Sequence, residues 1–94
     1  MNKYESVIII NPNLEAESIK GLTEKFSNLI NTDGNVSSVE ELGKKKLAYE
    51  INKNKEGYYV VYKFEANPNL IQELERVYRI TDEVIKFIVV KEEE

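Results

Sequence analysis

One short repeat constrains the fold of this 94-residue chain more than any other feature of its sequence. The tetrapeptide Asn-Pro-Asn-Leu occurs at residues 11–14 and again at residues 67–70. Each copy follows a run rich in β-branched and aromatic residues and precedes a stretch with helical spacing of apolar residues. A four-residue match arises easily by chance, but this one lies at equivalent points in both halves. The repeat therefore predicts two successive strand–helix–strand units.

The local pattern gives the elements of these units. Strands are expected at residues 3–10, 36–51, 58–65 and 84–91. Helices are expected at residues 14–31, ended by a left-handed cap at Asp33-Gly34, and from Pro68 onward, where Asn67 can cap. Gly43 is a candidate bulge in the second strand. Right-handed crossovers then place both helices on one face of a four-stranded antiparallel sheet. This is an α+β, ferredoxin-like split βαβ (βαββαβ) domain at residues 1–94, with a short acidic tail at 92–94.

The composition excludes several classes of protein. No apolar run is longer than residues 7–10, so we expect no membrane segment or signal-peptide core. The chain has no Cys, which excludes disulfides and thiolate metal sites and makes the cytosol its natural setting. It has no His either, so the usual general base and the usual soft metal ligands are missing. We therefore expect no catalytic residue, metal or cofactor.

Charge is unevenly spread along the chain. Residues 43–55 carry five Lys against one Glu, a local +4, although the net charge is −4. The same segment lies in a predicted hairpin whose polar turn ends at Gly57. An acidic protein with one basic segment is a poor independent nucleic-acid binder, because the general attraction to phosphates is missing. It can still contact a polyanion along one edge if a basic partner supplies the rest.

The strands carry apolar residues on both faces, although a sheet covered on one side should alternate apolar and polar residues. One parity is expected to face the helices: Ile8, Ile10, Val60, Tyr62, Phe64, Phe87 and Val89. The other parity leaves an apolar set on the open face: Val7, Ile9, Tyr59, Val61, Ile88 and Val90. Scattered surface apolar residues are normal, but this excess recurs on three strands and predicts a protein contact. On this hypothesis Val61→Glu leaves the fold intact and weakens partner binding.

Four segments resemble the bacterial small-subunit (30S) ribosomal protein six family. They are residues 1–5 (MNKYE), 39–51 (VEELGKKKLAYEI), 56–59 (EGYY) and 74–82 (LERVYRITD), and the resemblance extends over residues 1–91. Many members of that family have Pro after the Ala-Tyr pair, whereas this chain has Glu50, which lets the strand continue.

The resemblance implies a structural component of the small ribosomal subunit in the cytoplasm. Such a protein binds the central domain of small-subunit (16S) rRNA together with ribosomal protein eighteen, as a heterodimer, and contributes to assembly. This fits an acidic chain whose open sheet needs a cover. The candidate RNA-binding residues are Lys3, Lys44, Lys45, Lys46, Arg76 and Arg79. The Lys run could equally be a solvated edge that discourages aggregation, and each Arg could pair with a nearby acid such as Glu73.

Three other functions share this topology. An RNA-recognition module would stack bases on its third strand, but Tyr59 replaces the expected small residue and Val60 stands where an aromatic belongs. An acylphosphatase-type enzyme would need an Arg-containing phosphate loop after the first strand, and residues 11–13 hold neither Gly nor Arg. A dimerising or regulatory interaction module without RNA binding would need a Gly-rich loop between strand and helix, and this sequence has none at residues 11–13. Weak self-association of the isolated chain through the open face stays open.

Overall fold

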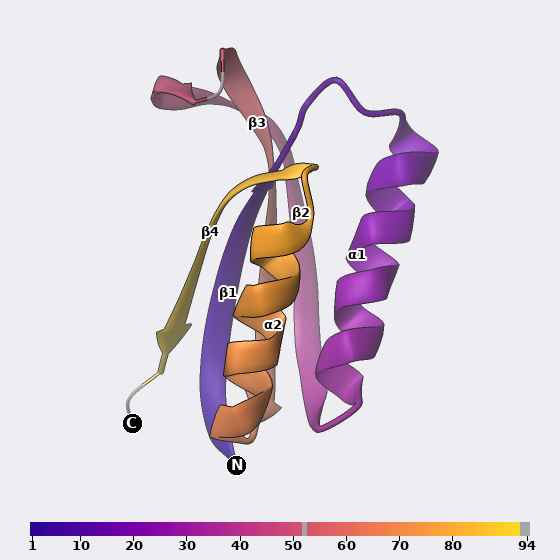
Figure 1. Cartoon of the computed structure of the whole chain (residues 1–94), viewed down its shortest axis with the longest axis vertical. Coiled ribbons are helices and arrows are strands. Elements are labelled where there is room, and N and C mark those ends of the chain that lie inside the picture. The colour runs from indigo at the N-terminus through magenta and orange to yellow at the C-terminus, as the bar shows by residue number, and fades with distance from the viewer. Residues whose placement is uncertain (52, 93–94) are drawn as a thin grey trace.

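The duplicated tetrapeptides lie at the two strand-to-helix junctions of the fold (Figure 1). The computed structural model describes residues 1–51 and 53–92, and within them the chain forms four strands and two helices. Their bounds are β1 (Asn2–Ile10), α1 (Ala16–Asn31), β2 (Gly34–Ile51), β3 (Asn54–Ala66), α2 (Pro68–Ile80) and β4 (Val84–Lys91). The antiparallel sheet has the order β2-β3-β1-β4, so β2 and β4 are its edges. The predicted fold class is confirmed.

The core lies between the sheet and the two helices, with α1 packed over β2 and α2 over β4 (Figure 1). The buried stripes of the helices follow the predicted spacing: Ile19, Leu22, Phe26 and Ile30 in α1, and Leu70, Leu74, Val77 and Tyr78 in α2. The sheet contributes Ile8, Ile10, Val60, Tyr62 and Phe64, each at most 2% exposed. The inner parity predicted from the sequence is confirmed, with Phe87 and Val89 half-buried at the margin of the core. No helix in the described part of the chain is long and apolar enough to cross a membrane.

Polar groups inside the core are paired. The hydroxyl oxygens of Ser6 on β1 and Tyr78 on α2 are 2.9 Å apart, and both residues are at most 1% exposed. The Tyr62 hydroxyl donates to the Thr23 carbonyl of α1 at 3.0 Å. Burial is the main cause that raises the pKa of both tyrosines above its usual value. These bonds tie each helix to the sheet.

Three predicted boundary details are wrong. Helix α1 begins at Ala16 instead of residue 14, and its C-cap Thr32 is right-handed with φ −69°, so no left-handed cap ends it. Gly34 is needed for space, because a Cβ there would lie 2.2 Å from the Glu65 carbonyl oxygen of the neighbouring strand. Asn67 occupies the N-cap position of α2, but its side chain donates to Asp33 at 3.0 Å and caps nothing.

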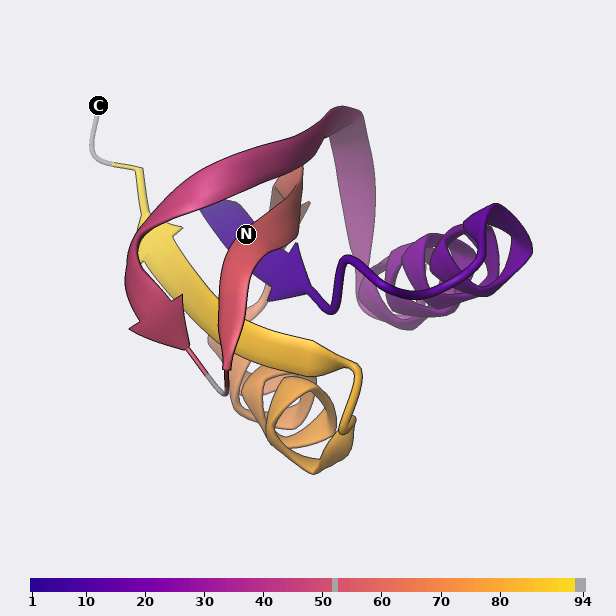
Figure 2. The ribbon, with the colours of Figure 1, turned by 90° about the horizontal axis from the view of Figure 1, so that it is seen from above.

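The β2–β3 hairpin is longer than predicted and leaves the plane of the sheet. The bulge predicted at Gly43 is confirmed: the register shifts between Glu41 and Gly43, and Gly43 has φ +79°. Beyond it, β2 and β3 continue as a two-stranded arm, comprising residues 44–51 and 53–57. Figure 2 shows this arm curling over the face of the sheet away from the helices, toward β4. Gly57, predicted in the turn, lies in β3. Of the predicted turn and acidic tail, Asn52 and residues 93–94 lie outside the described residues.

Candidate functional site

The arm covers part of the open face of the sheet. Leu47 of the arm is 7% exposed, and Ile9 and Val61 on the open face are 8% exposed each. Gly57 permits this approach, because a Cβ there would lie 2.2 Å from Ile9 Cγ2 and 3.4 Å from Leu47 Cδ2. A second, smaller apolar cluster therefore lies on the side of the sheet opposite the core.

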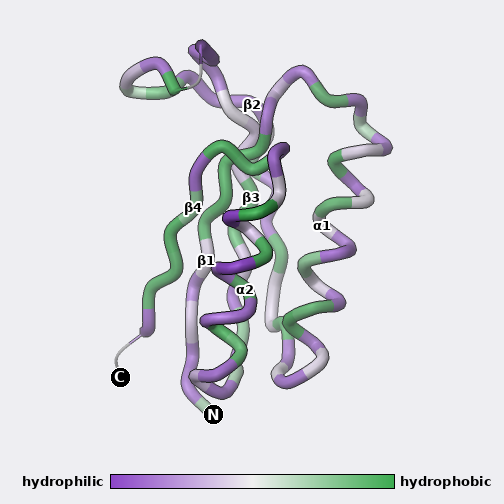
Figure 3. Tube along the Cα trace, in the orientation of Figure 1, coloured by the Kyte–Doolittle hydropathy of each residue, from purple (hydrophilic) through white to green (hydrophobic). Residues whose placement is uncertain are grey.

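Apolar side chains on the open face become more exposed from β3 toward β4. In the antiparallel register, Val7 of β1 lies between Val61 of β3 and Ile88 of β4. Val61 is 8% exposed, Val7 is half-buried and Ile88 is 52% exposed. Val90, further along β4, is 48% exposed. Figure 3 shows hydrophobic residues along most of β4, and the exposed apolar residues of the open face, Ile88 and Val90, lie on this edge strand.

The open face predicted from the sequence must therefore be corrected. Of its six residues, Ile9 and Val61 are buried, Val7 and Tyr59 are half-buried, and only Ile88 and Val90 are exposed. The physical reason is that strand parity reports which face a side chain is on, and not whether a distant hairpin folds over that face. The binding role of the six residues stays a prediction.

The far end of the arm contacts β4 through a polar pair of described side chains, Tyr49 and Lys86. The Lys86 ammonium of β4 donates to the Tyr49 hydroxyl of β2 at 2.8 Å and lies 5.3 Å from the centroid of the Tyr49 ring. The hydrogen bond to Tyr49 raises the pKa of Lys86. Both side chains face solvent. Sequence reasoning missed Leu47 and Tyr49. A single large aliphatic among lysines was the available signal for Leu47, and nothing comparable marked Tyr49.

The arm also carries the predicted basic run. Lys44, Lys45 and Lys46 are exposed on the edge strand β2, in register with residues 58, 57 and 56 of β3. Lys3 is also exposed. In the sheet register it lies opposite Glu65, which is nine residues further along β3 than Glu56, the residue opposite Lys46. At about 3.3 Å per residue, that offset is about 30 Å. The structure therefore does not bring Lys3 together with the Lys run.

The two predicted arginines lie on α2 and contact the protein's own side chains. Arg76 Nε donates to Glu73 Oε2 at 3.1 Å, and its terminal nitrogen donates to the other carboxylate oxygen. This exposed pair lowers the pKa of Glu73 and raises that of Arg76. The Arg79 guanidinium carbon lies 6.0 Å from the centroid of the Phe87 ring. The structure therefore contains the Arg76–Glu73 pair, which the sequence offered as the alternative to an RNA contact.

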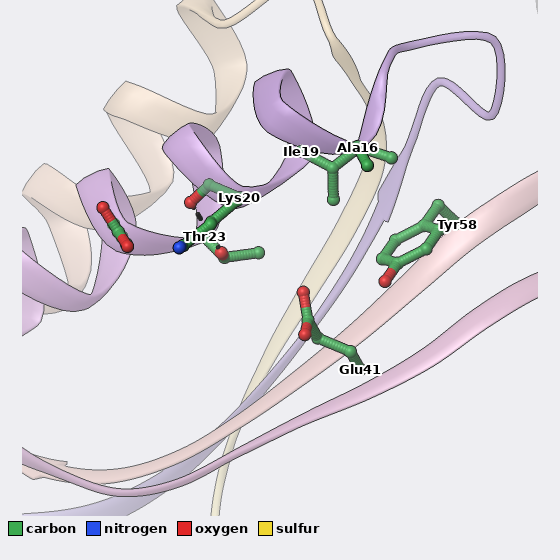
Figure 4. Close-up of a pocket in the computed structure, with 7 residues that line it drawn as sticks. Ala16, Ile19, Lys20, Thr23, Glu41 and Tyr58 are labelled. Atoms are coloured by element: carbon green, nitrogen blue, oxygen red, sulfur yellow. Dashed lines mark hydrogen bonds between the residues drawn. The ribbon is translucent and has the colours of Figure 1, made fainter.

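A shallow groove of about 450 Å³ lies between α1 and the β2–β3 pair. In Figure 4, Glu41 and Tyr58 lie on the strand side of the groove, and Ile19 and Thr23 on the helix side. Burial raises the pKa of the Tyr58 hydroxyl, and the adjacent Glu41 carboxylate adds to the shift. Within the described residues, no group of three or more acidic side chains is arranged to hold a metal ion. The groove was not foreseen from the sequence, and its side chains assemble no recognisable catalytic constellation.

Comparison with known proteins gives one consistent result. The family model described as ribosomal protein S6 matches residues 3–91. The chain is 50% identical to small ribosomal subunit protein bS6 of Clostridium perfringens (strain SM101 / Type A), over 100% of both chains. It is 51% identical to the protein of the same name from Clostridium novyi (strain NT), over 99% of both chains.

Solved structures agree with this result. The crystal structure of 30S ribosomal protein S6 from Thermotoga maritima superposes with a TM-score of 0.92 at 38% identity, covering 97% of this chain and 87% of that one. A protein of Arabidopsis thaliana matches with a TM-score of 0.58 at 15% identity, covering 100% of this chain and 95% of that one. The second match shows a shared fold alone.

Proposed function

Because this chain belongs to the ribosomal protein S6 family, we propose that it binds the central domain of small-subunit (16S) rRNA together with ribosomal protein eighteen, as a heterodimer that contributes to subunit assembly. Family membership itself makes the protein a component of the small subunit of the cytoplasmic ribosome, and a structural component instead of an enzyme. The observation that carries the proposal is the uncovered apolar edge at Ile88 and Val90, beside a basic arm on an acidic chain.

The apolar edge supports a protein partner. Ile88 and Val90 are both about half exposed on β4, and within the described part of the chain β4 pairs with β1 alone. An aliphatic surface next to a free strand edge is the kind of surface that proteins bury against another chain. Burying it would remove apolar area from water, at about 25 cal/mol for each Å².

Charge supports a joint mode of RNA binding. The exposed Lys44, Lys45 and Lys46 give the arm a positive edge that can lie along phosphates. The rest of the chain is acidic, with a net charge of −4 for the whole, so phosphate repulsion offsets much of that attraction. A basic partner docked at β4 would reverse this balance. The pair would then bind RNA more tightly than this protein does alone.

The test is a fluorescence anisotropy titration of a labelled rRNA central-domain fragment at fixed salt. The mixture of this protein with ribosomal protein eighteen is expected to bind at least tenfold tighter than this protein alone. Equal affinity of the isolated protein and the pair would refute the proposal. If neither RNA nor ribosomal protein eighteen bound while the chain dimerised in sedimentation runs, an interaction module without RNA binding would replace it.

The same titration tests the Lys run. Each lysine that contacts a phosphate contributes roughly 0.7–0.9 to the slope of log affinity against log salt. Changing Lys44, Lys45 and Lys46 to Gln should therefore lower the slope of the pair by about 2. The matched control changes three other exposed lysines, Lys20, Lys25 and Lys91, and should leave the slope unchanged. Equal losses in both triple variants would show that net charge matters and that the Lys run has no special role.

A further inference from the structure

The arm lies over apolar side chains that the proposed function would otherwise leave available to a partner. Ile9 and Leu47 both lie beside Gly57, and Val61 on the neighbouring strand β3 is as buried as Ile9. The same face is uncovered at Ile88. The chain thus covers part of its own open face, reaches β4 at Lys86, and leaves Ile88 and Val90 on that edge exposed.

The arm has a hinge at its base. Gly43 has φ +79°, a left-handed conformation that favours glycine, and the register with β3 shifts at this point. A Cβ at Gly43 would meet nothing within 4 Å, so glycine is needed there for backbone conformation and not for space. A second register shift follows between Lys46 and Ile51, and this irregular stretch contains Leu47 and Tyr49. On the other strand of the arm, residues 54–57 lie beyond the last β1–β3 pair, Ile10 and Tyr58, so that ladder does not hold the arm in place.

The arm has a latch at its far end. The pair of Lys86 and Tyr49 joins the arm to β4 by a 2.8 Å hydrogen bond and by contact of the ammonium with the ring. Both groups are exposed, and exposed pairs of this kind contribute little to stability. The latch is thus weak enough for a competing partner to break. It lies on the open face beside Ile9, since Lys86 and Ile9 are opposite each other in the β1–β4 register.

We propose that the arm (residues 44–51 and 53–57) is an intramolecular strap, which closes over Ile9 and Val61 in the free protein and is released at Gly43 when a protein partner docks along β4. This inference rests on the proposed function for its partner, ribosomal protein eighteen, but closure of the strap is a property of the isolated chain. Release extends the apolar row from Ile88 through Val7 to Val61 and breaks the latch at Tyr49. The strap therefore lowers the affinity for the partner while it protects the free protein from self-association.

Closure is tested in the isolated protein by methyl NOE spectroscopy. Ile9 Cγ2 and Leu47 Cδ2 both lie within 3.4 Å of the position where Gly57 would carry a Cβ, so an NOE between these methyl groups is expected. Lys86→Gln, which weakens the latch, should reduce its intensity. Lys91→Gln, on the same strand but away from the arm, is the control and should not. An absent NOE in the native chain, or equal intensities in all three proteins, would overturn the strap.

Release is tested by calorimetric titration with ribosomal protein eighteen. If the strap competes with the partner, Lys86→Gln should bind about two- to fivefold tighter than the native chain, the gain expected from losing a contact worth up to about 1 kcal/mol. Tyr49→Phe removes the hydrogen bond but keeps the ring, and should give a smaller gain. Unchanged or weaker binding of both variants would overturn release. If no protein bound at all, the proposed function and the release step would both fail, while the NOE comparison would still decide whether the strap closes.

Discussion

Two substitutions on one row of the sheet separate the covered part of the open face from the exposed part. Val61 and Ile88 lie on either side of Val7, on the same face, but they are 8% and 52% exposed. The sequence alone treats them as equivalent and predicts that Val61→Glu leaves the fold intact. The structure replaces that prediction: Val61→Glu should destabilise the protein strongly, whereas Ile88→Glu should not.

The magnitude follows from burial. Removing a buried valine side chain forfeits about 1.5–3 kcal/mol of transfer free energy. The new carboxylate must then stay at this buried position in a neutral form, or displace the groups that cover it. Either route adds to the loss, so we expect a total of about 3 kcal/mol. For a domain of this size that lowers Tm by roughly 12–24 °C. The side chain at position 88 already faces solvent, so Ile88→Glu should cost about 1 kcal/mol or less, chiefly through lower β-propensity.

The assay is thermal and urea unfolding of the two variants beside the native chain. A carboxyl held at this buried position should have a raised pKa, so the loss of stability in Val61→Glu should shrink when the pH is lowered from 7 to about 4.5. Ile88→Glu should instead lose at least tenfold in affinity for ribosomal protein eighteen. If Val61→Glu were as stable as Ile88→Glu at pH 7, Val61 would not be covered in solution and the reasoning about the arm would be wrong.

Three further predictions concern the core and the glycines. Ser6→Ala should lower the free energy of unfolding by about 1–3 kcal/mol, because it leaves the Tyr78 hydroxyl buried without its partner. In a double-mutant cycle with Tyr78→Phe, the two changes together should cost less than the sum of the single changes. Additive costs in urea unfolding would contradict the pairing. Because burial raises the pKa of Tyr62 and Tyr78, the folded state binds more protons than the unfolded state above the usual tyrosine pKa. Stability from these groups should be fully present below about pH 10 and fall above it, and Tyr78→Phe should flatten that fall; an alkaline unfolding curve with no such change would refute the assignment. Gly57→Ala should destabilise, since its Cβ would lie 2.2 Å from a β1 side chain, whereas Gly21→Ala on the exposed side of α1 meets nothing within 4 Å and should stabilise by about 0.5–1 kcal/mol. The two glycine variants are each other's control in thermal unfolding, and a shift of the same sign in both would contradict the packing at the arm.

Local patterns accounted for the element order because they depend on short stretches of chain. The repeat at residues 11–14 and 67–70 located both strand-to-helix junctions, and the apolar spacing gave the buried stripes of both helices. Alternation along β3 assigned Val60, Tyr62 and Phe64 to the core, since side chains on a strand must point to opposite faces in turn. The bulge at Gly43 was also readable, because glycine inside a strand often marks one.

Non-local contacts decided what the sequence could not. Gly34 and Gly57 looked like cap and turn residues, yet each is needed because another strand's atoms approach closely. Arg76 had two plausible partners in the sequence, RNA or an acid one turn away, and in the fold it bonds to Glu73.

The sequence by itself determined a split βαβ sheet with one face too apolar for water and one basic hairpin. Only the tertiary structure decided that this hairpin folds back on that face beside Ile9, and that Ile9 and Val61 are buried while Ile88 and Val90 are exposed. The physical reason is that strand parity is fixed by adjacent peptide units, whereas the cover depends on a bend at Gly43 and on Leu47 and Ile9, far apart in the chain, coming together beside Gly57.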